Sequence, residues 1–200
     1  MKKHSLSDLN EAFKLLNERL ELNDVTHFNL VVCGGTSLIA TKLVERTTKD
    51  VDVVAFIDET GNLADPEPMP ESLLKEVKAV ASDLGLYENW LNNGPSKGDG
   101  GLFRSGLPTG FASRLIKHEI GSKLTLYFIS RLDQIHFKLF ASVDRFGGYH
   151  TNDLMQLNPA DDEILMAAEW SMTQDPSEGY KMMLKKFLEH FGYGHLCEKI

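Results

Sequence analysis

The fold is decided by residues 31–56, VVCGGTSLIATKLVERTTKDVDVVAF. An apolar strand runs into a glycine pair, a stretch with helical character follows, and a second apolar strand comes after it. Side chains two apart in a strand point to the same side. Asp50 and Asp52 are therefore predicted to share one face, with Val51 and Val53 buried on the other.

Asp50 and Asp52, the acid pair, predict a site for a divalent cation. At an effective dielectric of 20, two like charges 4 Å apart repel by about 4 kcal/mol. A divalent ion between them reverses that sign, and Mg²⁺ prefers a few carboxylate oxygens together with phosphate and water. Asp50 and Asp52 are thus the predicted Mg²⁺ ligands, and the alternative is a strand end that carries two solvated acids.

The glycine pair predicts a place for phosphates. Backbone amides between a strand and a helix N-terminus attract anions, and the two residues that follow add hydroxyl donors. The turn lacks the lysine of a Walker loop and the third glycine of a dinucleotide fingerprint, and its simpler interpretation is a tight strand-to-helix connection. The predicted nucleotide-binding residues are Gly34, Gly35, Thr36, Ser37, Arg46 and Thr48.

Composition bounds the class of protein. Two hundred residues allow one sizeable core, or a core domain with a helical appendage, but not two large independent domains. The net charge of -8 argues against a broad grip on nucleic acid and leaves only a local basic groove formed by Arg114, Lys117 and Lys123. Two cysteines, and no leader or long apolar run, predict a cytoplasmic protein that does not enter a membrane.

The periodicity predicts an α/β (α+β) chain with a mixed sheet. Residues 1–130 are expected to form the core, and residues 131–200 a helical C-terminal region packed on it. A capping box at Ser5 to Asp8 opens an amphipathic helix. Strands are predicted at 28–33 and 51–57, helices at 37–44 and 72–84, loops at 58–71 and 92–110, and a hairpin at 112–129.

The motif Gly34-Gly35-Thr36-Ser37-Leu38, followed by Arg46, Thr48 and Asp50-Val51-Asp52, resembles the Gly-Gly/Ser and Asp-x-Asp signature of the nucleotidyltransferase (polymerase-beta-like) superfamily. Within it, the chain is similar to the bacterial AbiEii-type toxin branch and its nucleotidyltransferase-like relatives. The similarity extends over most of the chain, through residues 107–110, 130–133 with 138–139, and 150–154.

The resemblance implies an enzyme that moves a nucleotidyl group from an NTP to a hydroxyl on RNA, such as tRNA, or on protein. It assigns Mg²⁺ to Asp50 and Asp52 and the triphosphate to the glycine motif and Thr48. A lysine and an aspartate from later helices complete the site in AbiEii-like members, which places Lys138 and Asp153 in catalytic roles. An antitoxin protein is then an expected partner.

One departure from the superfamily pattern leaves a second interpretation open. Many active transferases carry a third acid on a neighbouring strand, and residues 123–129 contain none. Glu119 is the nearest substitute, although a surface glutamate is the simpler interpretation, and Asp153 could otherwise activate the incoming hydroxyl. The alternative function is a catalytically inactive nucleotide-binding or regulatory module of the same fold.

Overall fold

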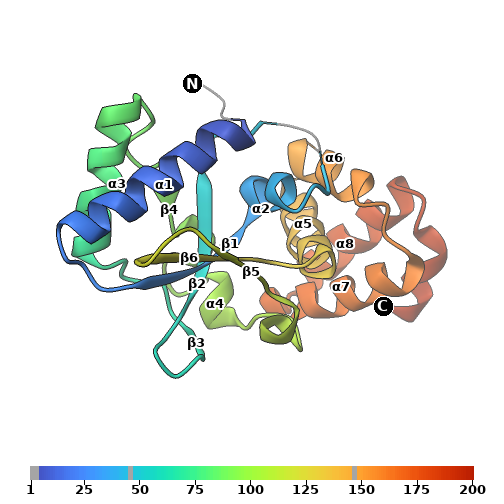
Figure 1. The fold of residues 1–200 in the computed structure, drawn as a ribbon. Coiled ribbons are helices and arrows are strands. Elements are labelled where there is room, and N and C mark those ends of the chain that lie inside the picture. Colours follow the sequence, from blue (N-terminus) through green and yellow to red (C-terminus); the bar gives the residue numbers. More distant parts are fainter. Residues whose placement is uncertain (1–4, 45–46, 146–147) are drawn as a thin grey trace. The chain divides into compact units, whose positions relative to one another are not determined.

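A computed structural model describes residues 5–44, 47–145 and 148–200. The chain divides into two units, Met1–Ile129 and Ser130–Ile200, and each is described by itself (Figure 1). This division lies one residue from the predicted boundary, while the predicted packing of the C-terminal region on the core stays a prediction. The architecture is of the α+β class, as the sequence predicts.

The first unit is built around a mixed sheet, which confirms the predicted sheet type. Its strand order is β3-β2-β1-β6-β5, with β4 beside β2, and β1 is antiparallel to β2 but parallel to β6. The elements of this unit are α1 (Leu6–Leu22), β1 (Phe28–Cys33), α2 (Gly34–Ala40), β2 (Val51–Ile57), β3 (Leu63–Ala64), α3 (Glu71–Leu84), β4 (Leu91–Asn92), η1 (Gly94–Ser96), α4 (Leu102–Ser105), η2 (Phe111–Arg114), β5 (Ile116–Glu119) and β6 (Leu124–Phe128).

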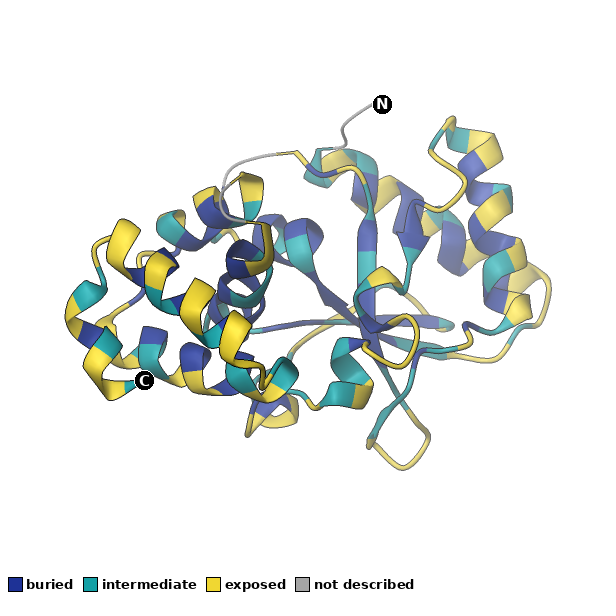
Figure 2. Ribbon diagram, turned by 180° about the vertical axis from the view of Figure 1, so that it is seen from behind, coloured by how far each residue is buried: buried dark blue, intermediate teal, exposed yellow. Residues whose placement is uncertain are grey.

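Helices α1 and α3 supply the apolar cover for one face of this sheet. The predicted capping box opens α1, because the Ser5 hydroxyl accepts a bond from the Asp8 amide and the Asp8 carboxylate accepts one from the Ser5 amide. The buried stripe of α1, which includes Phe13, packs with α3 against alternate residues of β1, β2 and β6. Figure 2 shows these central strands in the colour of buried residues. This core fixes which face of β2 remains for the acid pair.

Three local predictions about this unit were wrong. The helix predicted at 37–44 runs over Gly34–Ala40, because Gly34 takes a positive φ of 66° and turns the chain into the helix directly from β1. Loop 58–71 contains β3, and loop 92–110 contains the helices η1 and α4. These short elements depend on tertiary contacts, which a glycine-rich and proline-rich sequence does not reveal.

A β-bulge at the middle of β2 explains the tertiary contact that holds the segment around Ser96. The register passes from Val31 opposite Ala55 to Val32 opposite Val53, so Val54 drops out of the ladder with β1. Its carbonyl accepts a 2.7 Å hydrogen bond from the hydroxyl of Ser96, which is fully buried. A buried carbonyl outside the ladder needs such a partner, and this bond ties the 92–101 segment to the sheet.

Ser96→Ala is expected to destabilise the protein by about 1–3 kcal/mol, because it leaves the buried Val54 carbonyl without its donor. Urea denaturation measures this difference. Ser113→Ala is the matched control, because that hydroxyl also donates to a backbone carbonyl, that of Gly110, but at an exposed site. Equal losses from the two variants would contradict the proposed role of the Ser96 bond.

The second unit is helical, as predicted. The bond pair between Ser130 and Asp133 caps its first helix, and Trp170 packs in its core against the rings of Phe137 and Phe140. The Arg131 guanidinium holds the pKa of the Glu163 carboxyl below its usual value. The elements are α5 (Arg131–Arg145), α6 (Tyr149–Gln156), α7 (Asp161–Gln174), α8 (Glu178–His190) and η3 (Gly194–Lys199).

Candidate functional site

The acid pair lies at the start of β2, and burial alternates along this segment as predicted. Val51 and Val53 are fully buried in the core, whereas Asp50 and Asp52 are half-buried. In the sheet, Asp52 lies between Cys33 of β1 and Asn92 of β4. Val51 and Val53 belong to the core under α1 and α3, and successive side chains of a strand alternate, so the Asp52 side chain lies on the opposite face of the sheet.

The carboxylate of Asp52 lies against the glycine corner, defined as Cys33, Gly34 and Gly35 where β1 passes into α2. A Cβ atom built on Gly34 would stand 2.7 Å from Asp52 Oδ2. Real Cβ atoms are essentially never that close to another heavy atom, so a side chain at position 34 would require the Asp52 carboxylate to shift. Position 34 needs glycine for a second reason, since its φ is positive.

The first turn of α2 also holds Asp50, through its backbone. The hydroxyls of Thr36 and Thr48 donate to the Asp50 carbonyl at 2.8 and 3.2 Å. Both threonines are buried. Each member of the acid pair is therefore positioned by the segment that follows β1: Asp52 at Gly34, and Asp50 at Thr36.

The hydroxyl donors predicted for phosphate thus serve the fold. Thr36 and Thr48 bind the Asp50 carbonyl, and Ser37 donates to the Ile129 carbonyl at 3.3 Å from a fully buried position. Gly35 is buried as well, and Arg46 lies outside the described residues. That these residues bind a nucleotide stays a prediction.

The sheet carries no third carboxylate beside the acid pair in the described ranges. The end of β6, where the Ile129 amide donates to the Val32 carbonyl, is apolar. Glu119 pairs in register with Thr125, which lies beside Asn29, four residues along β1 from Cys33. At about 3.3 Å per residue, Glu119 is at least about 13 Å from the level of Asp52.

Glu119 is thereby excluded as a third metal ligand, and the simpler interpretation of it as a surface residue is confirmed. Its carboxylate bonds the Lys117 ammonium, and its side chain is 70% exposed. Among the described residues, no group of three or more His, Cys, Asp or Glu side chains is arranged to hold a metal ion. From the described residues, a Mg²⁺ here would have the two carboxylate ligands of the acid pair, with phosphate and water completing its shell.

Lys138 and Asp153, which the resemblance assigns to catalysis, meet inside the second unit. Lys138 Nζ lies 2.8 Å from Asp153 Oδ2, and the two side chains are 4% and 3% exposed. The Lys138 ammonium also lies 5.9 Å from the centre of the Tyr149 ring. The two residues form a buried ion pair between α5 and α6, and their predicted catalytic roles stay predictions.

Two of the three cations predicted to form a basic groove, Lys117 and Lys123, are partly neutralised by carboxylates. Lys117 bonds Glu119, Lys123 Nζ lies 3.2 Å from Asp24 Oδ1, and Arg114 donates to the Thr109 carbonyl. These pairs are exposed and therefore weak. They nevertheless reduce the positive field that a phosphate backbone would meet.

Sequence reasoning missed the neighbour of Asp52 on β4. Asn92 pairs with Asp52 in register, although its segment was assigned to a loop. The buried pair Trp90 and Leu91 just before it was the available signal, because two large apolar residues ahead of an asparagine-rich turn are typical of a short strand.

The fold and this site define an α+β protein whose mixed sheet ends in an acid pair beside a glycine corner. No family model, no curated protein and no solved structure matches the chain. Within the described ranges, no helix has both the length and the apolar composition needed to span a membrane.

Proposed function

We propose that this protein is a Mg²⁺-dependent nucleotidyltransferase that moves an NMP from an NTP to a hydroxyl of RNA or protein. One observation carries the proposal. The carboxylate of Asp52 lies against Gly34 while the backbone of Asp50 is bonded to Thr36, so one short turn positions both acids. Acids that merely ended a strand in solvent would need no such support.

The residues of the first unit fit a magnesium site of modest ligand number. Asp50 and Asp52 would hold the ion, which supplies positive charge to a bound triphosphate. Gly34 brings backbone close to the acid pair without a side chain, so a phosphate can approach the same corner. Since α2 has only seven residues, its backbone amides, more than a helix dipole, would contact that phosphate.

A specific observation favours a second candidate function, a nucleotide-binding module without turnover. The end of β6, which lies across β1 from the acid pair, is apolar, and Glu119 is too distant to activate an incoming hydroxyl. A module of this kind would bind NTP and Mg²⁺ but release no pyrophosphate. The toxin of a toxin–antitoxin pair, the role implied by the resemblance, belongs to the first candidate.

Mg²⁺ with NTP is expected to stabilise the wild-type protein against heat by about 2.7 kcal/mol at a ligand concentration one hundred times its dissociation constant. EDTA should remove the effect. Asp52→Asn should remove it too, because the amide keeps the shape of the carboxylate but loses its charge. Differential scanning calorimetry with each of the four NTPs measures the shift, and radiolabelled NTP with total RNA or lysate measures transfer.

Asp58→Asn is the matched control, because Asp58 follows the other end of β2 and its carboxylate only accepts bonds within its own turn. This variant should keep both the shift and the transfer. A shift with no pyrophosphate release identifies the binding module. If no NTP changes the unfolding temperature, or if transfer persists in Asp52→Asn, the proposed site is wrong.

A further inference from the structure

Strand β5 forms an open edge of the sheet in the first unit. It pairs with β6 on one side and is the last strand in the order. All four of its residues are exposed, and Ile116 keeps 48% of its surface accessible. An exposed edge presents unpaired backbone donors and acceptors, which can pair with another strand.

The hydrogen-bond pattern fixes which residues present those groups. The Ile120 amide donates to the Leu124 carbonyl, its partner in register. Bonded pairs alternate along an antiparallel ladder, so Ile116 and His118 also direct their backbone groups toward β6. Lys117 and Glu119 consequently direct their amides and carbonyls toward the open edge.

The side chains along this edge form a self-complementary series, Ile116-Lys117-His118-Glu119-Ile120. If two copies pair antiparallel about His118, Lys117 of each lies opposite Glu119 of the other. Opposite charges in register stabilise an antiparallel pair, and like charges destabilise it. Shifting the register by two residues either way would place Lys117 opposite Lys117, or Glu119 opposite Glu119.

We propose that β5 is a homodimer interface, where a second copy of this chain extends the sheet about a two-fold axis at His118. Lys117 and Glu119 have outward backbone groups and also carry opposite charges. The register centred on His118 therefore satisfies both the backbone hydrogen bonds and the charge pairing. A lysine alone on an edge strand blocks pairing. A lysine and a glutamate two residues apart instead select an identical partner in a closed, isologous contact.

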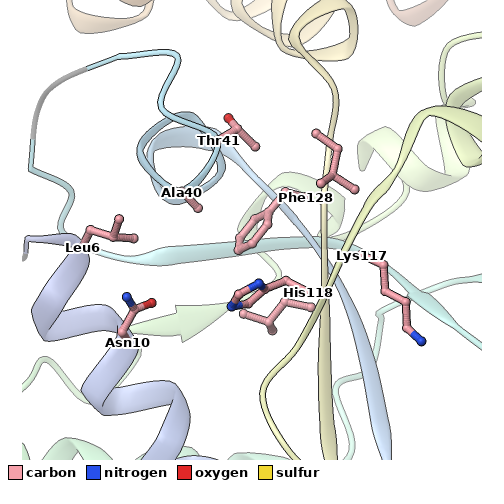
Figure 3. Close-up of a pocket in the computed structure, with 9 residues that line it drawn as sticks. Leu6, Asn10, Ala40, Thr41, Lys117, His118 and Phe128 are labelled. Atoms are coloured by element: carbon pink, nitrogen blue, oxygen red, sulfur yellow. The ribbon is translucent and has the colours of Figure 1, made fainter.

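On the side of α1, the side chains of β5 border an open space. A hollow of about 330 Å³ lies beside the strand, lined by residues that include Asn10, His118 and Phe128. In Figure 3 His118 points toward this hollow and Lys117 points away from it. The two-fold pairing would bring Ile116 opposite Ile120 of the second copy, which covers an apolar side chain that is now half exposed.

The contact involves few residues, so we expect a weak dimer that forms with increasing concentration. Sedimentation velocity over about 10 µM to 1 mM measures its dissociation constant. Glu119→Lys and Lys117→Glu should each raise that constant about tenfold, because each variant converts two attractive pairs into two repulsive ones. The double variant Lys117→Glu/Glu119→Lys should restore the wild-type value.

These variants separate the proposed register from a general charge effect. Glu119→Lys makes the net charge less negative and Lys117→Glu makes it more negative, so a general effect would move the two constants in opposite directions. Both positions are exposed, and an unchanged unfolding temperature verifies folding. A monomer at every concentration, single variants that dimerise like the wild type, or a double variant without recovery would each overturn the proposal.

Discussion

Lys138→Met is expected to lower the free energy of unfolding of the second unit by about 3–5 kcal/mol. The lysine and Asp153 are both almost fully buried, and their charged atoms are 2.8 Å apart. Methionine fills a similar volume but removes the charge, so the Asp153 carboxylate stays in an apolar interior without its cation. Urea denaturation followed by circular dichroism measures the loss.

The double variant Lys138→Met/Asp153→Leu is the matched control. Replacing both members of a buried ion pair by apolar groups is often neutral or stabilising, because the desolvation cost disappears together with the attraction. We therefore expect the double variant to recover most of the lost stability. A double variant as unstable as the single one would show that packing, and not the unpaired charge, causes the loss.

The same pair of variants tests the catalytic roles that the resemblance assigns. If Lys138 and Asp153 serve only the fold, the double variant should transfer label from NTP as well as the wild type does. If they act on substrate, transfer should fall although the unfolding free energy has recovered. The two readouts distinguish these roles, because a buried ion pair can serve either stability or chemistry.

The strands of the first unit were predictable because their patterns are local. Phe28–Cys33 and Val51–Ile57 have the bounds expected from their apolar and β-branched residues. Helix α2 was predicted three residues late, since the turn from strand to helix takes place at a single glycine, Gly34. The sequence predicts a loop around Ser96, and the bond that holds this segment reaches Val54, 42 residues away in sequence.

In the candidate site, too, local patterns predict some features and tertiary contacts decide the others. The half-burial of Asp50 and Asp52 beside two buried valines follows from a period of two. The hydroxyls of Thr36 and Thr48, which the sequence predicts as phosphate donors, bond the Asp50 carbonyl in the structure, and their role toward phosphate stays a prediction. Composition identifies a donor, but only the three-dimensional arrangement shows which acceptor it reaches.

Gly34→Ala is expected to destabilise the protein and to abolish its stabilisation by Mg²⁺ with NTP. Two costs combine at this position. An L residue at a φ of 66° costs about 1–2 kcal/mol, and the new methyl group would stand 2.7 Å from Asp52 Oδ2. The carboxylate has to move away, which removes it from the arrangement on which the proposed metal site depends.

Gly61→Ala separates these two costs. Gly61 also has a positive φ, 84°, but a Cβ there would meet nothing within 4 Å. This control should therefore show the backbone cost alone and keep the response to Mg²⁺ with NTP. Denaturation of both variants measures the difference, which we expect to be about 0.5–1 kcal/mol greater at Gly34, because the Asp52 carboxylate is the end of a side chain that can shift.

A double-mutant cycle with Asp52→Ala locates the cause of the additional cost. Truncating Asp52 removes the atom that the new methyl group would meet, so Gly34→Ala should cost about as much in that background as Gly61→Ala does in the wild type. Coupling of this kind arises between residues in direct contact and is small between distant ones. If the two substitutions are additive and Gly34→Ala also keeps the response to Mg²⁺ with NTP, Asp52 does not lie against the glycine corner in solution, and the proposed nucleotidyltransferase site has no geometric basis.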